Sequence, residues 1–210
     1  MAVKWVASLL IIIGIAVLSY PSLHNQYVAH QQTKLFERFE QQPLLTEPQT
    51  DINDSYEQLD TVFDQGDRRP LAFPSIDDAV VLATLEIPSI QLKLPVLEGA
   101  TMTNLEYAVG HMSETADFGE PGNVALAAHR SYKAGKLFNR LDEVKPDDTI
   151  TAVTQAGELQ YRVTKAFRVS PNDLSVLNQP DDYAMMTLIT CDPIEDPTHR
   201  LIVQAEQVNE

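Results

Sequence analysis

From residue 80 onward the sequence is a succession of short apolar and β-branched segments, each bounded by glycine, proline or other turn-forming residues. Short strands at such spacing, with few helical stretches between them, are typical of β-barrels. The expected strands are 80–87, 91–98, 123–128, 149–154, 158–169, 185–190 and 199–206. Short helical patterns cover only 103–109, with Thr101 or Thr103 as its cap, and 135–141. The sequence therefore predicts a mainly β domain over residues 80–210, closed or nearly closed into a barrel.

An apolar run occupies the N-terminus. It extends from Trp5 to Tyr20, preceded only by the positive charges of Lys4 and the terminal amine. Its length is somewhat below the roughly 20 residues that span a bilayer, and the positive-inside rule directs the amino terminus to the cytoplasm. A cleaved signal peptide is the alternative, although Pro21 makes the cleavage site unfavourable. We therefore expect residues 1–21 to be a single-pass transmembrane signal-anchor in the cell membrane, with the rest extracellular.

Two further segments connect this anchor to the β domain. Within residues 22–42 the side chains of Leu23, Tyr27 and Leu35 recur at roughly helical spacing, which predicts a helical stalk. Residues 43–78 are acidic and irregular, and a segment of this composition buries little apolar surface. We therefore expect residues 22–79 to form an extracellular helical stalk and acidic linker.

The charge of the chain restricts its partners. The formal net charge of the 210 residues is -15. Because phosphate neutralisation requires basic surface, the sequence predicts no nucleic acid partner. A surplus of acidic residues is most simply a feature that keeps the chain soluble.

The single cysteine, Cys191, follows the predicted strand 185–190, and Arg200 opens the next strand. The thiol and the guanidinium can therefore be neighbours in space. A lone cysteine is most often a small buried hydrophobe. An unpaired thiol in an exported chain, at a strand end where reactive groups are commonly presented, is also a candidate nucleophile.

His129 directly follows the predicted strand 123–128. Because side chains alternate across a strand, Val124 and Leu126 should face the core, while Ala127 and His129 share the opposite face. Small alanines would then leave room beside the imidazole. Arg130 points the other way and is expected to be a surface or salt-bridge residue.

The same alternation turns Arg200 away from the core face of Leu201 and Val203. In the strand that carries Cys191 the parity stays ambiguous, because Leu188 is as apolar as Ile189.

Four other histidines compete with His129. His24 and His30 lie in the predicted stalk and are expected to be solvated, while His111 follows Gly110 in a loop and His199 adjoins Arg200, so each of these two is most simply a loop or surface histidine. No spacing among the cysteine and the histidines resembles a metal-ligand motif, and no metal site is predicted.

The run Thr187-Leu188-Ile189-Thr190-Cys191 resembles the signature Thr-Leu-X-Thr-Cys of the sortases, the cysteine transpeptidases of Gram-positive bacterial surfaces. The histidine of Ala127-Ala128-His129-Arg130 and the downstream Arg200 match the other two parts of that family's site. The resemblance covers residues 81–207. It implies an eight-stranded sortase-type β-barrel, with Cys191, His129 and Arg200 as the catalytic residues.

The reaction that this resemblance implies is a ping-pong transpeptidation. Cys191, as thiolate, would attack the Thr-Gly bond of a Leu-Pro-X-Thr-Gly-like sorting signal of a secreted surface protein. His129 would exchange protons, and Arg200 would stabilise the oxyanion. An amine of a peptidoglycan precursor or of a pilin would then resolve the thioacyl enzyme. The residues expected to bind substrate are Ala127, Ile189 and Thr190.

No cofactor is implied by the resemblance. Calcium activates some sortases, but Glu114, Asp117 and Glu120 cannot be told from ordinary loop carboxylates in so acidic a chain. Calcium dependence is therefore left open and is not predicted.

Several alternatives remain open. Residues 43–79 could form an inhibitory flap like that of pilus-building sortases, but its Asp-Pro-aromatic anchor is replaced by Ala72-Phe73-Pro74. No second apolar span precedes Glu210, and both departures favour wall anchoring over pilin polymerisation. An L,D-transpeptidase would need a Ser-His-Gly-X-X-Cys-like run, which is absent. The last alternative is a non-catalytic, membrane-tethered adaptor in which Cys191 is merely packed.

Overall fold

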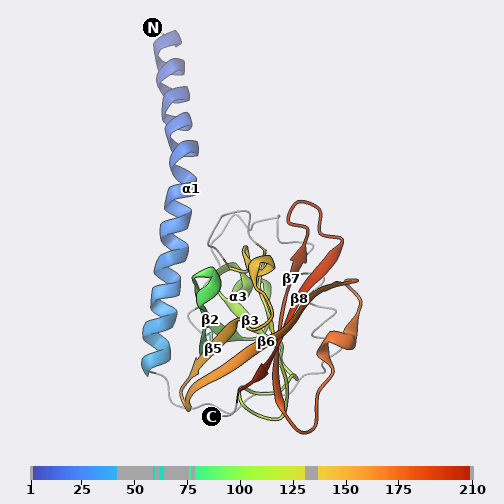
Figure 1. The fold of residues 1–210 in the computed structure, drawn as a ribbon. Helices are drawn as coiled ribbons and strands as arrows, with labels where there is room; N and C mark the ends of the chain where they lie inside the picture. Colours follow the sequence, from blue (N-terminus) through green and yellow to red (C-terminus); the bar gives the residue numbers. More distant parts are fainter. Residues whose placement is uncertain are drawn as a thin grey trace.

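The computed structural model describes residues 2–41, 59, 62–63, 76, 79–130 and 137–208. Within them, eight strands close into a barrel in the order β1-β2-β3-β4-β7-β8-β6-β5 (Figure 1). The strands are β1 (Val81–Ile87), β2 (Leu92–Glu98), β3 (Val109–His111), β4 (Gly122–Ala127), β5 (Thr149–Thr154), β6 (Gly157–Val169), β7 (Ala184–Asp192) and β8 (His199–Gln207). The helical elements are α1 (Ala2–Gln41), α3 (Met102–Tyr107) and the short 3-10 turns η1 (Pro88–Ile90), η2 (Leu141–Glu143) and η3 (Leu174–Leu177). The predicted mainly β barrel is confirmed.

Two strand pairings determine where the predicted site residues lie. Strand β4 pairs with β7 in parallel, and the last pair in their register is Ala127 with Ile189. Strand β7 pairs with β8 antiparallel, and Cys191 stands directly opposite Arg200. The ends of β4 and β7 and the start of β8 therefore meet at one rim of the barrel.

The barrel interior is filled as the alternation along the strands predicts. Val124 and Leu126 of β4 and Leu201 and Val203 of β8 belong to one buried apolar cluster. Leu188 of β7 joins the same cluster, which resolves the ambiguous parity of that strand. Ile189 and Cys191 belong instead to a second cluster on the outer face of the barrel.

Most predicted elements agree with the structure, but one predicted helix is wrong and one strand was not predicted. Helix α3 begins after Thr101, whose hydroxyl accepts a hydrogen bond from the backbone N–H of Asn104 over 3.2 Å. It ends before Val109, which starts the unpredicted strand β3. Three residues are too few to show a strand period, and β3 exists because it pairs in parallel with β2.

The helix predicted over 135–141 is wrong for its described residues. Leu137 forms an isolated β-bridge with Arg130. The backbone N–H of Phe138 donates to the carbonyl oxygen of His129 over 3.1 Å, instead of to a carbonyl four residues earlier. Only the short turn η2 follows.

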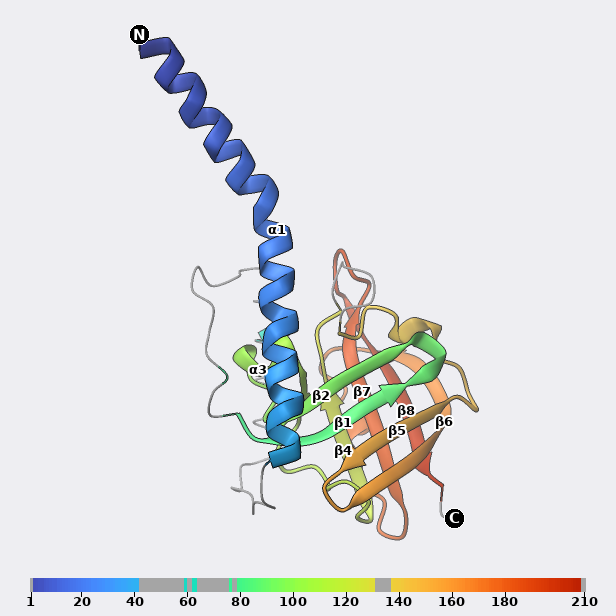
Figure 2. The same cartoon turned by 90° about the vertical axis from the view of Figure 1, so that its left-hand side faces the viewer.

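Helix α1 is continuous over 40 residues, and its C-terminal half lies against the barrel beside β1, β2 and α3 (Figure 2). Val28 and Leu35 are buried in a cluster with Leu97 and Tyr107. The predicted helix is confirmed, but it packs on the domain and is not a free stalk. His24, expected in solvent, is 7% exposed and lies 3.5 Å from a carboxylate oxygen of Glu106.

The N-terminal half of α1 runs beyond the barrel (Figure 2). Large apolar side chains there are exposed, including Trp5 at 77% and Leu18 at 82%. Even so, no helix in the described part of the chain is long and apolar enough to qualify as a membrane-crossing segment, and the predicted transmembrane anchor is not supported.

The expectation that residues 43–78 bury little apolar surface is wrong for the residues that can be placed. Leu59, Val62, Phe63 and Ile76 are between 1% and 9% exposed. The acidic average composition of the segment gave no sign of these isolated apolar side chains, because their packing partners lie far away in the sequence. The segment Ala72-Phe73-Pro74, considered as a flap anchor, lies outside the described residues.

Candidate active site

The cysteine and the arginine of the predicted site are in contact. The Nη1 atom of Arg200 donates to Sγ of Cys191 over 3.8 Å, and the two residues are directly paired between β7 and β8. Cys191 is 7% exposed and Arg200 is 3% exposed. A guanidinium that is held this close to a sulfur favours the ionised thiol, because opposite charges attract strongly where water is excluded.

The position of His129 is set by the register of β4 with β7. Beyond the last strand pair, the backbone N–H of Ala128 donates to the carbonyl oxygen of Ile189 over 3.2 Å. The hydroxyl of Thr190 donates to the carbonyl oxygen of Ala128 over 2.7 Å. His129 is the next residue, so it leaves β4 beside the end of β7 that carries Cys191.

Phe63 links the histidine to the arginine. Its ring centroid lies 5.6 Å from that of His129, in an edge-to-face arrangement. The guanidinium carbon of Arg200 lies 5.0 Å from the same centroid. His129 and Arg200 therefore both contact one aromatic side chain, which comes from the segment before the barrel, and Arg200 also contacts Cys191.

An apolar cluster surrounds this meeting point, and we call it the outer cluster. Its members are Leu59, Val62, Phe63, Leu105, Met112, Ala125, Ala127, Val176, Leu177, Ile189, Cys191 and Ile202. Two of the predicted substrate-binding residues, Ala127 and Ile189, belong to it and are fully buried. Leu59, Val62 and Phe63 of the segment before the barrel belong to the same cluster.

Thr190, the third predicted substrate-binding residue, occupies a different position. Successive side chains of β7 alternate, so Thr190 faces away from the side shared by Ile189 and Cys191. It is fully buried and holds the end of β4 through its hydrogen bond to Ala128. The geometry gives Thr190 a structural role.

A buried ion pair joins the residues that directly follow His129 and Cys191 in the chain. Arg130, directly after His129, donates through Nη1 to Oδ1 of Asp192, directly after Cys191. Its Nη2 atom lies 2.9 Å from a carboxylate oxygen of Asp142. The ion pair expected for Arg130 is confirmed, although its side chain is buried, at 6% exposed. The sequence signal that predicts this pair is the opposite charge at equivalent positions after two strands.

Asp192 is also bound by a second arginine. The Nε atom of Arg168 in β6 donates to Oδ2 of Asp192. Burial disfavours the ionised carboxylate, but the hydrogen bonds from Arg168 and Arg130 outweigh it and hold the pKa of Asp192 below its ordinary value. The hydrogen bond to Asp192 in turn raises the pKa of Arg168.

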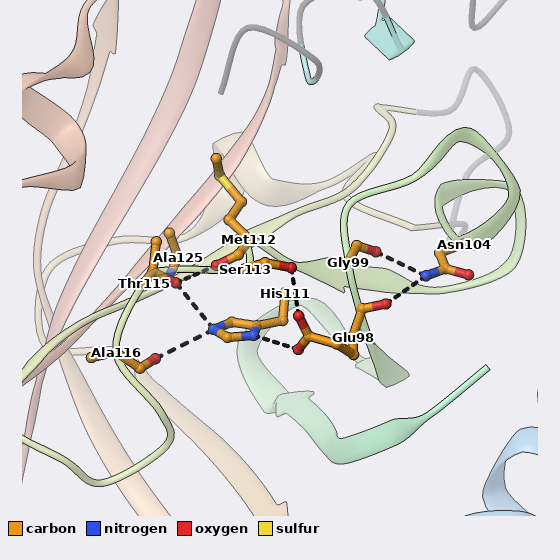
Figure 3. Close-up of polar contacts among 9 residues, drawn as sticks. All are labelled: Glu98, Gly99, Asn104, His111, Met112, Ser113, Thr115, Ala116 and Ala125. Atoms are coloured by element: carbon orange, nitrogen blue, oxygen red, sulfur yellow. Dashed lines mark hydrogen bonds and ion pairs between the residues drawn. The ribbon is translucent and has the colours of Figure 1, made fainter. Parts of the chain in front are cut away.

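His111, expected in a loop, is the last residue of β3 and is 1% exposed. Its Nδ1 atom lies 2.8 Å from Oε2 of Glu98, and its Nε2 atom lies 3.0 Å from the hydroxyl of Thr115 and 3.3 Å from the carbonyl oxygen of Ala116 (Figure 3). Both ring nitrogens are engaged in these contacts. The prediction that His111 is a loop or surface histidine is therefore wrong.

The contacts of His111 brace the loop before β4. The hydroxyl of Ser113 donates to Oε1 of Glu98 over 2.6 Å. The hydroxyl of Thr115 donates to the carbonyl oxygen of Met112 over 2.7 Å and accepts from the backbone N–H of Ala125 over 3.1 Å (Figure 3). Because Ala125 belongs to the outer cluster, this network supports the strand that ends at the candidate site.

Among the described residues, no group of three or more histidine, cysteine, aspartate or glutamate side chains could hold a metal ion. Glu114, Asp117 and Glu120, considered for calcium, form no such group. His30 and His199 are exposed, as expected.

Comparison with known proteins gives consistent matches over the barrel. The sortase domain family model matches residues 85–208. Sortase A of Bacillus anthracis is 34% identical over 161 residues, which are 73% of this chain and 75% of that protein. Sortase A of Streptococcus agalactiae is 26% identical over 217 residues, covering 97% of this chain and 84% of that protein. A lid mutant of sortase A from Corynebacterium diphtheriae has a similar structure, with a TM-score of 0.60 and 25% identity, over 76% of this chain and 94% of that one.

Proposed function

The chain belongs to the sortase family of cysteine transpeptidases, and we propose that it cleaves a Leu-Pro-X-Thr-Gly-like sorting signal through a thioacyl intermediate on Cys191. The observation that carries this proposal is the hydrogen bond from Arg200 to Cys191 at the rim where β4 delivers His129. Acyl transfer through a cysteine needs a nucleophile, a group that transfers protons and a donor for the oxyanion, and the thiol, the imidazole and the guanidinium can supply these.

In the first half of the reaction, the thiolate of Cys191 attacks the carbonyl carbon of the signal threonine. A carbon–sulfur bond forms, and the carbonyl electron pair moves to the oxygen. When the tetrahedral intermediate collapses, the bond to the glycine nitrogen breaks, and the imidazolium of His129 donates its proton to the departing amine. The threonine carbonyl is left as a thioester.

In the second half, an acceptor amine attacks the thioester and loses a proton to His129. The carbon–sulfur bond breaks, and Cys191 returns to the thiolate. Arg200 serves both halves, because it can stabilise the free thiolate and the oxyanion of each tetrahedral intermediate. Loss of one such donor typically costs about 10²- to 10³-fold in rate.

The apolar part of the signal would bind in the outer cluster. Ala127 and Ile189 lie there next to Cys191, and an aliphatic side chain and a proline ring gain free energy when buried against such residues. Phe63 currently contacts both His129 and Arg200, so it must move before a peptide can reach the thiol.

The acceptor is proposed to be an amine of a peptidoglycan precursor, with a pilin amine as the alternative. The departure of this sequence from the flap pattern of pilus-building sortases favours the wall acceptor. We propose that the catalytic domain acts at the outer face of the cell membrane. The exposed Trp5 and Leu18 at the projecting end of α1 offer apolar surface for contact with lipid.

The experiment that tests this function uses the full chain, with a panel of Leu-Pro-X-Thr-Gly peptides and hydroxylamine as the acceptor. Mass spectrometry should find a hydroxamate at threonine and a released peptide that begins with glycine. The Cys191→Ala variant should give neither product. Absence of cleavage by the wild-type chain across the whole panel would refute the assigned signal.

A further inference from the structure

We propose that Arg130 and Asp192 are positioning residues, which hold His129 in register with Cys191 through their buried ion pair. Each directly follows one of these two residues in the chain: Arg130 lies just beyond the end of β4, and Asp192 is the last residue of β7. This inference rests on the proposed function. It assigns to two charged residues outside the signature a part in the reaction that neither performs by touching substrate.

The need for such a pair follows from where the backbone ladder ends. The register of β4 with β7 stops at Ala127 and Ile189, and the hydrogen bond from the N–H of Ala128 extends it by one step. Beyond that point the backbone of the β4 end pairs elsewhere. The carbonyl of His129 accepts from Phe138, and Arg130 bridges to Leu137. At His129, therefore, the backbone no longer pairs with β7 and pairs instead with residues 137–138.

Beyond the last backbone hydrogen bond, the side chains of Arg130 and Asp192 connect the chain after β4 to the end of β7. Arg130 donates to Asp192 through Nη1 and reaches Asp142 of η2 through Nη2, at 2.9 Å. The second oxygen of Asp192 accepts from Arg168 of β6. The side chains of Arg130 and Asp192 are only 6% and 9% exposed, so water cannot readily replace either partner. A forked guanidinium bound to two carboxylates has little freedom to rotate.

The pair lies on the opposite side of the strands from the reactive groups. Successive side chains alternate, so Cys191 faces the outer cluster while Asp192 turns to the face of Thr190. A side chain on that face cannot contact a peptide bound at the outer cluster. Its influence on the reaction must therefore pass through the orientation of the imidazole and the thiol.

A purely structural ion pair is the competing explanation, and the two make different predictions for kinetics. Loss of positioning should lower kcat and leave KM nearly unchanged, because a shift of about 1 Å between reacting groups can cost about 10²-fold in rate. Loss of stability alone should reduce the folded fraction and leave the turnover of folded enzyme as it was.

The first test compares Asp192→Asn and Arg130→Lys with the wild-type full chain on a cleaved signal peptide, with rates normalised to folded protein. We expect kcat to fall about 10- to 100-fold in Asp192→Asn, with KM within about twofold. Arg130→Lys keeps the positive charge but loses the forked guanidinium, and its kcat should lie between those of the wild type and Asp192→Asn. The matched control is Arg140→Ala, which removes an arginine paired with Glu143 near η2 at 2.7 Å. It should behave as wild type.

A kcat of folded Asp192→Asn within twofold of wild type, or a KM that rises by the same factor as kcat/KM falls, would overturn the proposal. If Asp192→Asn does not fold, Arg130→Lys is judged by the same two criteria.

The second test needs no substrate and separates this inference from the proposed function. Iodoacetamide alkylates Cys191 at a rate that rises with access to the thiol and with the thiolate fraction, to which the imidazole of His129 contributes. Asp192→Asn should slow alkylation severalfold in the wild-type background and have no further effect in the His129→Ala background. An equal slowing in both backgrounds would show that the pair does not act through His129. Peptide cleavage could fail entirely without changing this result.

Discussion

Arg200 and Cys191 are directly opposed on β8 and β7, and the guanidinium Nη1 donates to the thiol sulfur over 3.8 Å. Antiparallel pairing places the side chains of opposed residues on the same face of the sheet. The contact is therefore set by the strand register and does not depend on a flexible loop. Any substitution that keeps the strands but changes the guanidinium tests its chemistry alone.

Arg200→Lys should fold and lower kcat/KM by about 10²- to 10³-fold. The ammonium of lysine keeps the charge, but its N–H donors all leave one nitrogen. The planar guanidinium of arginine has donors on three nitrogens and can bind the sulfur and the oxyanion in turn. Steady-state peptide cleavage measures the loss. Arg162→Lys, an exposed change on β6, is the matched control. Near-normal turnover in Arg200→Lys would contradict the oxyanion role.

Cys191→Ala should retain the fold and lose the acyl-enzyme. The side chain is small and nearly buried, so its truncation removes little packing, whereas the reaction has no other nucleophile in the site. Intact-protein mass spectrometry after incubation with a signal peptide should show an adduct on the wild-type chain only. An adduct of equal yield on Cys191→Ala would place the nucleophile elsewhere.

The parts of the fold that sequence could predict depend on local periodicity. Alternation along β4 and β8 correctly separated Ala127 from Leu126 and Ile202 from Leu201, because a strand has a period of two residues regardless of its partner. The site depended on the same rule. Alternation predicted the facing of the imidazole and the guanidinium, whereas the facing of the thiol stayed ambiguous until the structure placed Leu188 in the barrel interior and Cys191 in the outer cluster.

The parts that sequence missed depend on contacts between distant segments. Strand β3 is defined by pairing with β2, and His111 is buried because Glu98 supplies a partner from that strand. Phe63 stands in an acidic segment whose composition suggests a solvated linker, yet its ring packs between His129 and Arg200. No local pattern identifies such a partner.

Phe63→Ala should make the candidate site more accessible. The ring contacts His129 and Arg200, so its removal uncovers groups that a peptide must reach. We expect iodoacetamide to alkylate Cys191 severalfold faster and KM for the signal peptide to fall. Phe39→Ala, in the part of α1 that packs on the barrel, is the matched control and should leave the alkylation rate unchanged. An unchanged rate in Phe63→Ala would show that the ring does not limit access.

The ion pair of Asp192 should make the stability of the protein depend on pH in the acid range. Its folded-state pKa is depressed, because hydrogen bonds from Arg168 and Arg130 outweigh the opposing effect of burial. A group of this kind contributes stability that is fully present above its ordinary pKa of about 3.9 and is lost as the pH falls through the lower folded value. Asp142, the other carboxylate bound to Arg130, is more exposed, at 43%.

Asp192→Asn cannot ionise and should lack this contribution. At pH 7 we expect it to unfold with a free energy about 1–3 kcal/mol lower than wild type, since the buried guanidinium of Arg130 loses its charged partner. Thermal unfolding of both chains from pH 7 to pH 2 measures the difference. The two stability curves should begin to converge as the pH falls below the ordinary carboxyl pKa of about 3.9, and should meet as it falls through the lower folded-state pKa of Asp192. A gap that stays constant to pH 2 would show that the charge of Asp192 does not contribute to stability.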